Sequence, residues 1–186
     1  MDVALVERAR DGDEEAFASL ARAGSDRLLA IAFRILRELG PAEDAVQQTL
    51  VLAWRGLPSL RDPERFEAWL TRLLVHTCYA ESRRGRRWAA MVRVLPIDGP
   101  ATHDDAVVSV LDRDQLERGF RRLPPDQRAV VVLHSYLGLT LPEIADQLGL
   151  PLGTVKSRLH YAMHALRAAL EADLRPSIDI SRERRA

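Results

Sequence analysis

Residues 139–160 read LTLPEIADQLGLPLGTVKSRLH, and they predict a compact pair of helices in the C-terminal part of the chain. Thr140, followed three residues later by Glu143, forms a capping box, so we expect a short helix to begin there. Gly149 can adopt the left-handed conformation that ends such a helix. The next helix is expected to open near Pro151, so the segment predicts two helices joined by a tight turn.

The second of these helices is predicted to have two chemically different faces. At 100° per residue, its apolar positions fall on one stripe, which consists of Val155, Leu159, Ala162, Leu166 and Leu170. The opposite face carries Ser157, His160, Tyr161 and His164, with Thr154, Lys156 and Arg158 on its flanks. This arrangement is typical of a helix-turn-helix whose second helix enters the major groove of DNA, with the backbone amides around Gly153 and Thr154 holding a phosphate.

Two other interpretations fit the spacing of this segment. An ordinary helical hairpin with a solvated outer face has the same periodicity. His160 and His164, four residues apart, also suit a metal ion, but no third ligand is evident nearby. We therefore expect no metal site and no cofactor.

The rest of the chain also has helical periodicity. Apolar residues recur at spacings of three, four and seven between Ala16 and Leu36, and Gly40-Pro41 is expected to end that pattern. Further helices are predicted over about 42–54, from about 64 into the arginines at 83–87, and over 107–122 and 126–137. No strand-like alternation persists anywhere, so the predicted fold class is all-α.

A polar segment rich in helix breakers divides the chain. It contains Pro96, Gly99 and Pro100 and has the composition of a flexible interdomain linker. We therefore expect two small helical domains, residues 1–94 and 109–172, joined by a flexible linker at 95–108. A polar tail, residues 173–186, follows the second domain, which contains the helix-turn-helix.

The charge balance excludes a simple polyelectrolyte that coats DNA. The chain has 27 basic and 27 acidic residues, so its formal net charge is zero. Between Arg83 and Arg93, however, there are five arginines, no acid and the interleaved Trp88. This cluster indicates either a phosphate contact or a solvated basic helix end.

The composition also indicates the cellular compartment of the protein. Cys78 is the only cysteine, so no internal disulfide is possible. The N-terminus lacks the apolar core of a signal peptide, and no apolar run approaches the roughly 20 residues that span a bilayer. We therefore expect a cytoplasmic protein without direct membrane insertion.

The order of residues in 139–160 closely resembles the promoter-reading domain of extracytoplasmic-function sigma factors, and the run Gly-Thr-Val-Lys-Ser-Arg is highly specific to them. In that family this helix reads the upstream promoter element, the minus-thirty-five box. The resemblance implies an upstream-box site made of Gly153, Thr154, Lys156, Ser157, Arg158, His160 and Tyr161. The sequence departs from the pattern after His160, where Tyr161-Ala162-Met163 replaces the usual Arg-Ala-Arg.

Two N-terminal segments resemble the same family in the expected order. Residues 44–54 resemble its polymerase-binding helix and imply contacts from Asp44, Gln47, Gln48 and Val51, where Gln48 replaces the usual acid. Taken alone, this segment also fits a plain amphipathic helix. Residues 66–73 resemble the segment that melts the downstream promoter element, the minus-ten box, and holds its non-template strand. The implied minus-ten site consists of Arg61, Phe66, Arg72, His76, Arg83, Arg84, Arg86 and Arg87, with His76 where asparagine is common.

The resemblance implies a transcription initiation factor without catalytic activity, whose partners are core RNA polymerase, promoter DNA and an anti-sigma factor. A stand-alone helix-turn-helix regulator is the alternative, but it would need a sensor or dimerisation domain, for which the first domain has no obvious signature. An enzyme would need a carboxylate or histidine cluster. The only such group is His103, Asp104 and Asp105, in the predicted linker.

Overall fold

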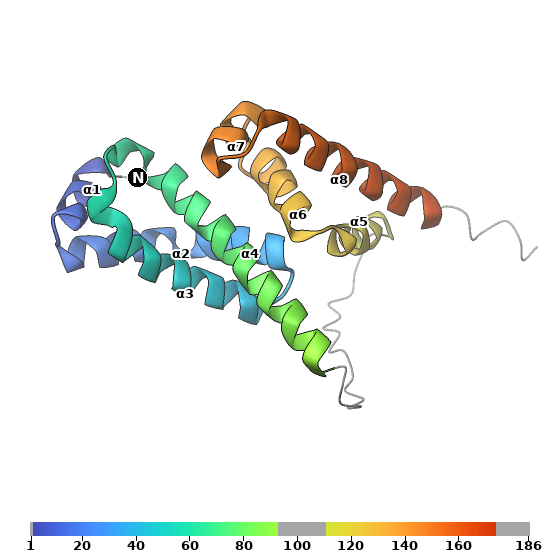
Figure 1. Cartoon of the computed structure of the whole chain (residues 1–186), viewed down its shortest axis with the longest axis horizontal. Coiled ribbons are helices and arrows are strands. Elements are labelled where there is room, and N and C mark those ends of the chain that lie inside the picture. The colour runs from blue at the N-terminus through green and yellow to red at the C-terminus, as the bar shows by residue number, and fades with distance from the viewer. Residues whose placement is uncertain (1, 93–110, 174–186) are drawn as a thin grey trace, which may run out of the picture.

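The computed structural model describes residues 2–92 and 111–173, and within those two ranges the chain is helical and contains no strand. An N-terminal bundle contains α1 (Val3–Arg10), α2 (Glu14–Leu36), α3 (Leu39–Gly56) and α4 (Phe66–Val92). A C-terminal bundle contains α5 (Leu111–Arg122), α6 (Pro125–Val131), α7 (Leu141–Leu148) and α8 (Leu152–Asp173) (Figure 1). The all-α prediction is confirmed. The predicted linker, residues 95–108, lies outside the described ranges, as does all of the predicted tail but its first residue.

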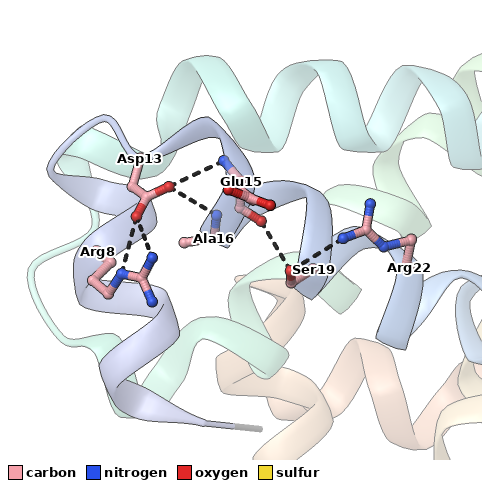
Figure 2. A network of polar contacts seen from close by, with 6 residues as sticks. All are labelled: Arg8, Asp13, Glu15, Ala16, Ser19 and Arg22. Carbon is pink, nitrogen blue, oxygen red and sulfur yellow. Dashed lines mark hydrogen bonds and ion pairs between the residues drawn. The ribbon is translucent and has the colours of Figure 1, made fainter.

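The corner between α1 and α2 is fixed by one carboxylate (Figure 2). Asp13 Oδ1 accepts hydrogen bonds from the backbone amides of Glu15 and Ala16, each at 3.0 Å, and so caps the N-terminus of α2. Its Oδ2 accepts from Arg8 Nε at 2.9 Å and Nη2 at 2.6 Å. The Ala16 amide, followed by Arg8, lowers the pKa of the Asp13 carboxyl. The sequence patterns did not predict α1.

Helices α2, α3 and α4 pack around a core of fully buried aliphatic side chains, among them Ile31, Ile35 and Leu74. A polar contact inside this core joins α3 to α4. The Thr49 and Thr77 hydroxyl oxygens are 2.6 Å apart, and each is also close to a backbone carbonyl of its own helix. One hydroxyl therefore donates to the other, which donates to its carbonyl, so neither is left unsatisfied.

The predicted boundary between the first two long helices was wrong. Helix α2 ends at Leu36, before Gly40-Pro41, because Arg37 adopts a left-handed conformation with φ of 66° and caps the helix. Gly40 and Pro41 lie in the first turn of α3, where proline removes no helical hydrogen bond. Two short 3-10 turns, Leu57–Ser59 and Pro63–Arg65, lie between α3 and α4.

The C-terminal bundle contains the predicted helix pair. At the start of α7, the Glu143 carboxylate accepts from the Thr140 amide at 2.7 Å, and Thr140 Oγ1 accepts from the Glu143 amide at 3.4 Å. Gly149 ends α7 with a φ of 65°. Val155, Ala162 and Leu166 of the predicted α8 stripe are buried, while Leu159 and Leu170 are half-buried. The predicted helix ending near 137 instead closes with a π-helical turn, Val132–Tyr136.

The two bundles share one apolar core. Helix α6 contacts both α2 and α4, and α7 contacts α4. Val130 and Leu133 of the C-terminal bundle are fully buried and belong to the same cluster of side chains as Ile35 and Leu74 of the N-terminal bundle. The domains predicted from the sequence are therefore packed together, which helical periodicity alone does not predict.

Candidate nucleic-acid and polymerase interfaces

The predicted upstream-box residues on the outer face of α8 form one exposed patch. Lys156, Ser157, His160 and Tyr161 are all exposed. Tyr161 has the largest exposed fraction, 61%, among the exposed large hydrophobic side chains described. The His160 and Tyr161 rings meet edge to face with centroids 5.7 Å apart. We call these four residues the α8 face. It offers donors, acceptors and an aromatic surface at the start of a helix, as major-groove reading requires.

Two other predicted upstream-box residues are engaged within the chain. Arg158 is turned away from the α8 face, and its Nε lies 3.1 Å from Asp126 Oδ2 with 24% of the side chain exposed. The Thr154 amide donates to the Pro151 carbonyl at 2.9 Å, which leaves Gly153 as the candidate for the predicted phosphate contact. Arg158 therefore links α8 to the start of α6, and its expected DNA contact stays a prediction.

The predicted polymerase-binding residues all lie on the solvent side of α3. Asp44, Gln47, Gln48 and Val51 are exposed, whereas the other side of the helix buries Ala42, Ala45, Val46, Thr49 and Ala53. Val51 is 43% exposed, and the neighbouring Leu52, which sequence reasoning missed, is 37% exposed. The α3 face therefore combines polar groups with apolar surface, as protein interfaces commonly do.

The predicted minus-ten residues are divided between the surface and the core. Seven of them are exposed, along α4 and in the loop before it: Arg61, Arg72, His76, Arg83, Arg84, Arg86 and Arg87. Phe66 is only 2% exposed, and its ring packs against Trp69 with centroids 5.9 Å apart. Because its ring is in the core, Phe66 supports the loop rather than presenting a surface to DNA in this arrangement.

His76 lies in a cationic setting on α4. Burial, followed by the charges of Arg72 and Arg83, lowers the pKa of His76 below its ordinary value of 6.5. The imidazole is therefore neutral at pH 7, and it meets the Tyr79 ring edge to face with centroids 6.3 Å apart. A neutral imidazole can both donate and accept a hydrogen bond, which suits a base edge better than a phosphate.

A groove of about 310 Å³ at the start of α4 is shared by the two bundles. Arg61, Arg65 and Arg72 line it from the N-terminal bundle, and Asp146 and Gln147 of α7 line it from the other side. Arg65 Nη2 lies 2.7 Å from Asp146 Oδ2. We call this the α4 groove. Sequence reasoning missed Arg65 and Asp146, because 81 positions separate them and no local pattern links the two.

The histidine and aspartate residues of the predicted linker are not part of the described structure. His103, Asp104 and Asp105 lie outside it. Within residues 2–92 and 111–173, no three histidine, cysteine, aspartate or glutamate side chains are grouped closely enough to hold a metal ion. None of the helices described there has the length and apolar character needed to cross a membrane.

Comparison with known proteins gives consistent matches over both bundles. Residues 20–88 match the family Sigma-70 region 2, and residues 113–166 match Sigma-70, region 4. The RNA polymerase sigma-H factor of Pseudomonas aeruginosa is 30% identical over 193 residues, covering 94% of this chain and 96% of that protein. The ECF RNA polymerase sigma factor SigL of Mycobacterium tuberculosis is 35% identical over 167 residues, covering 86% and 94%.

Solved structures are similar in fold as well as in sequence. The sigma factor RpoE of Bartonella quintana, in complex with the anti-sigma factor NepR, is 28% identical with a TM-score of 0.64 and covers 84% of this chain and 98% of its own. CnrH, in complex with the cytosolic domain of CnrY, is 28% identical with a TM-score of 0.62 and covers 92% and 98%.

Proposed function

The chain belongs to the extracytoplasmic-function sigma factors, which direct core RNA polymerase to promoters, and we propose that its two bundles divide the polymerase and promoter contacts as follows. The N-terminal bundle, within residues 1–94, binds the polymerase through α3 and the minus-ten box through α4. The C-terminal bundle, within residues 109–172, reads the minus-thirty-five box through α8. Sigma factors are initiation factors and not enzymes, so the polymerase performs the chemistry.

The observation that carries this assignment is the exposed α8 face, which lies on the second helix of a capped helix-turn-helix. The glycine turn at Gly149 and the Arg158–Asp126 contact hold α8 in place, while the Ser157, His160 and Tyr161 side chains are exposed. The Ser157 hydroxyl donates to the Thr154 carbonyl at 3.0 Å, and its oxygen can still accept a hydrogen bond from a base edge. Lys156 lies to one side and supplies affinity through a phosphate, which attracts all sequences alike. Base contacts by the other three residues would then select the box.

The remaining contacts follow the same division. Asp44, Gln47, Gln48 and Val51 meet the polymerase from the exposed side of α3, with Leu52 adding apolar area. Arg61, Arg72 and His76 bind the opened non-template strand of the minus-ten box. The four arginines from Arg83 to Arg87 hold its phosphates.

Two further proposals rest on the relatives. The B. quintana relative RpoE binds an anti-sigma factor, and we infer a protein inhibitor of the same kind for this chain. Because the chain works on polymerase and DNA, we place it in the cytoplasm.

A reconstituted transcription assay tests the assignment directly. The purified chain, core polymerase and a promoter library with both boxes randomised should yield transcripts enriched in one upstream and one downstream sequence. Asp44→Arg combined with Gln47→Ala should abolish polymerase binding and all enrichment, because a reversed charge would face the partner surface. Asp26→Arg, an exposed acid on α2, is the matched control and should leave both intact. Selective retention of an upstream sequence by the chain alone in a DNA-binding selection, with no enriched transcripts when polymerase is present, would favour the stand-alone regulator.

A further inference from the structure

The surroundings of Tyr161 on α8 limit which base this part of the helix can read. The Tyr161 side chain is 61% exposed. At 100° per residue, the exposed α8 positions within about 60° of it are Ser157, His164, Ala165 and Ala168. None of these four residues is an arginine, lysine, asparagine, glutamine, aspartate or glutamate. Tyr161 therefore lies among side chains that are small or that carry a hydroxyl or an imidazole.

The two cations near the start of α8 do not stand ready beside Tyr161. Arg158 Nε lies 3.1 Å from Asp126 Oδ2, and only 24% of the Arg158 side chain is exposed. Lys156 is exposed, but it lies about 140° around the helix from Tyr161. In this structure Arg158 is engaged with a carboxylate, and Lys156 is placed for a phosphate rather than for the base that Tyr161 meets.

The four bases present different groups in the major groove. Guanine offers two acceptors that arginine or lysine meets best, adenine pairs best with asparagine or glutamine, and the cytosine amino group donates to aspartate or glutamate. Thymine alone presents a methyl group, which an apolar side chain contacts. Because the residues around Tyr161 include none of those polar partners, its aromatic ring matches thymine better than the other three bases.

The Tyr161 ring is supported by its neighbour on the helix. The His160 and Tyr161 rings meet at an interplanar angle of 69°, with centroids 5.7 Å apart. This contact restricts the rotamers of both side chains, so less conformational entropy is lost when the ring packs against a base. Ala165 lies one turn further along α8 on the same side, and its short side chain places no polar group beside the ring.

We propose that Tyr161 selects an A·T pair in the upstream box by packing its ring against the 5-methyl group of thymine in the major groove. The ring provides the preference, and the hydroxyl is not needed for it. Burying one methyl-sized group changes affinity about fourfold, which sets the size of the expected preference. This inference rests on the proposed function, because it takes the α8 face as the surface that reads the upstream box.

Replacing one thymine by deoxyuridine tests the proposal, because the two nucleotides differ only in the 5-methyl group. Selection from a randomised upstream box, with polymerase present, first identifies the position at which Tyr161→Ala changes the preferred base. The wild type should select an A·T pair there. With deoxyuridine in place of the thymine of that pair, the complex of the wild-type chain with core polymerase should bind the promoter about fourfold more weakly. The same replacement in the spacer between the boxes is the DNA control and should leave the affinity unchanged.

Three variants separate the ring from the hydroxyl and from the rest of α8. Tyr161→Phe keeps the ring and should retain the difference between the two promoters, whereas Tyr161→Ala should bind both equally. Met163→Ala is the matched control, because it removes another exposed apolar side chain that lies about 160° around the helix, and it should retain the difference. Both positions are exposed, so these substitutions should leave the fold intact.

The outcomes separate this proposal from the proposed function. Three results would overturn methyl reading while the α8 face still selects a box: a G·C pair or no position assigned to Tyr161, equal wild-type binding of the thymine and deoxyuridine promoters, or loss of the difference in Tyr161→Phe. If the wild type with polymerase enriches no upstream sequence at all, the proposed function of the α8 face fails as well.

Discussion

The α8 face and the α4 groove are both surfaces proposed to read DNA, yet they differ in what lies in front of them. The α8 face is open, and its most protruding residue, Tyr161, is 61% exposed. The α4 groove is capped by Asp146 and Gln147 from the other bundle. Local sequence motifs predict residues of both surfaces, but tertiary packing decides which of the two surfaces is accessible. One proposed reading surface is thus exposed in this structure, and the other is partly covered by the C-terminal bundle.

The largest expected effect comes from loosening α7, which both supports α8 and caps the α4 groove. Ile144 is fully buried, so Ile144→Ala should destabilise the C-terminal bundle by about 2–5 kcal/mol. Upstream-duplex binding should fall with it, because α8 loses its support. Met163→Ala, at a 39% exposed position on α8, should change stability by about 0.5 kcal/mol or less. Equal denaturation midpoints for the two variants would contradict this role of α7.

The next effect concerns the open surface. Tyr161→Arg should strengthen upstream-box binding and shift the preferred base towards guanine, which arginine meets with two hydrogen bonds. His160→Ala should lower the free energy of discrimination between bases at one position of the box by about 1–3 kcal/mol. Selection from a randomised upstream box with polymerase present measures both changes. If both variants select the wild-type box at wild-type strength, the α8 face does not read the promoter.

A smaller effect is expected from the arginines at the end of α4. Arg84 is 78% exposed, with only a 3.8 Å contact to Glu81, so it is available to a phosphate. Replacing Arg84 and Arg87 by alanine should lower the slope of log affinity against log salt by about 0.7–0.9 for each lost contact. Arg22→Ala with Arg55→Ala removes the same charge elsewhere on the bundle and should leave the slope unchanged. If the slope is unchanged when Arg84 and Arg87 are replaced, these arginines form a solvated helix end and do not contact phosphates.

The smallest effect is expected at the cap of the α4 groove. Asp146→Asn removes the charge that pairs with Arg65, and an exposed ion pair of this kind is worth about 0.2–1 kcal/mol. The free chain should therefore bind the minus-ten strand up to about fivefold more tightly. Glu171→Gln removes the same charge from an exposed site on α8 and controls for long-range repulsion of DNA. A matching gain in the control would show that Asp146 acts only through net charge.

The sequence predicted the local features of this fold and missed the long-range ones. The capping box at Thr140, the glycine turn and the exposed side of α3 follow from short spacings, because capping and amphipathicity act within a few turns of helix. The end of α2 was misplaced, because Arg37 adopts a left-handed conformation that glycine usually takes. The ion pair of Arg158 was not predicted, because its partner, Asp126, lies 32 positions away in another helix. No periodicity could reveal that contact or the one between Arg65 and Asp146.

The distance between the two bundles tests the central claim most directly. Donor and acceptor dyes on Arg22→Cys and Glu171→Cys lie on different bundles, outside every proposed binding surface, and Cys78 is buried. The free chain should show high energy transfer. Core polymerase should abolish most of it, since boxes about 25 base pairs apart require the two reading surfaces to span ~85 Å of duplex at about 3.4 Å per base pair. High transfer that persists in the polymerase complex, or low transfer in the free chain, would contradict the account.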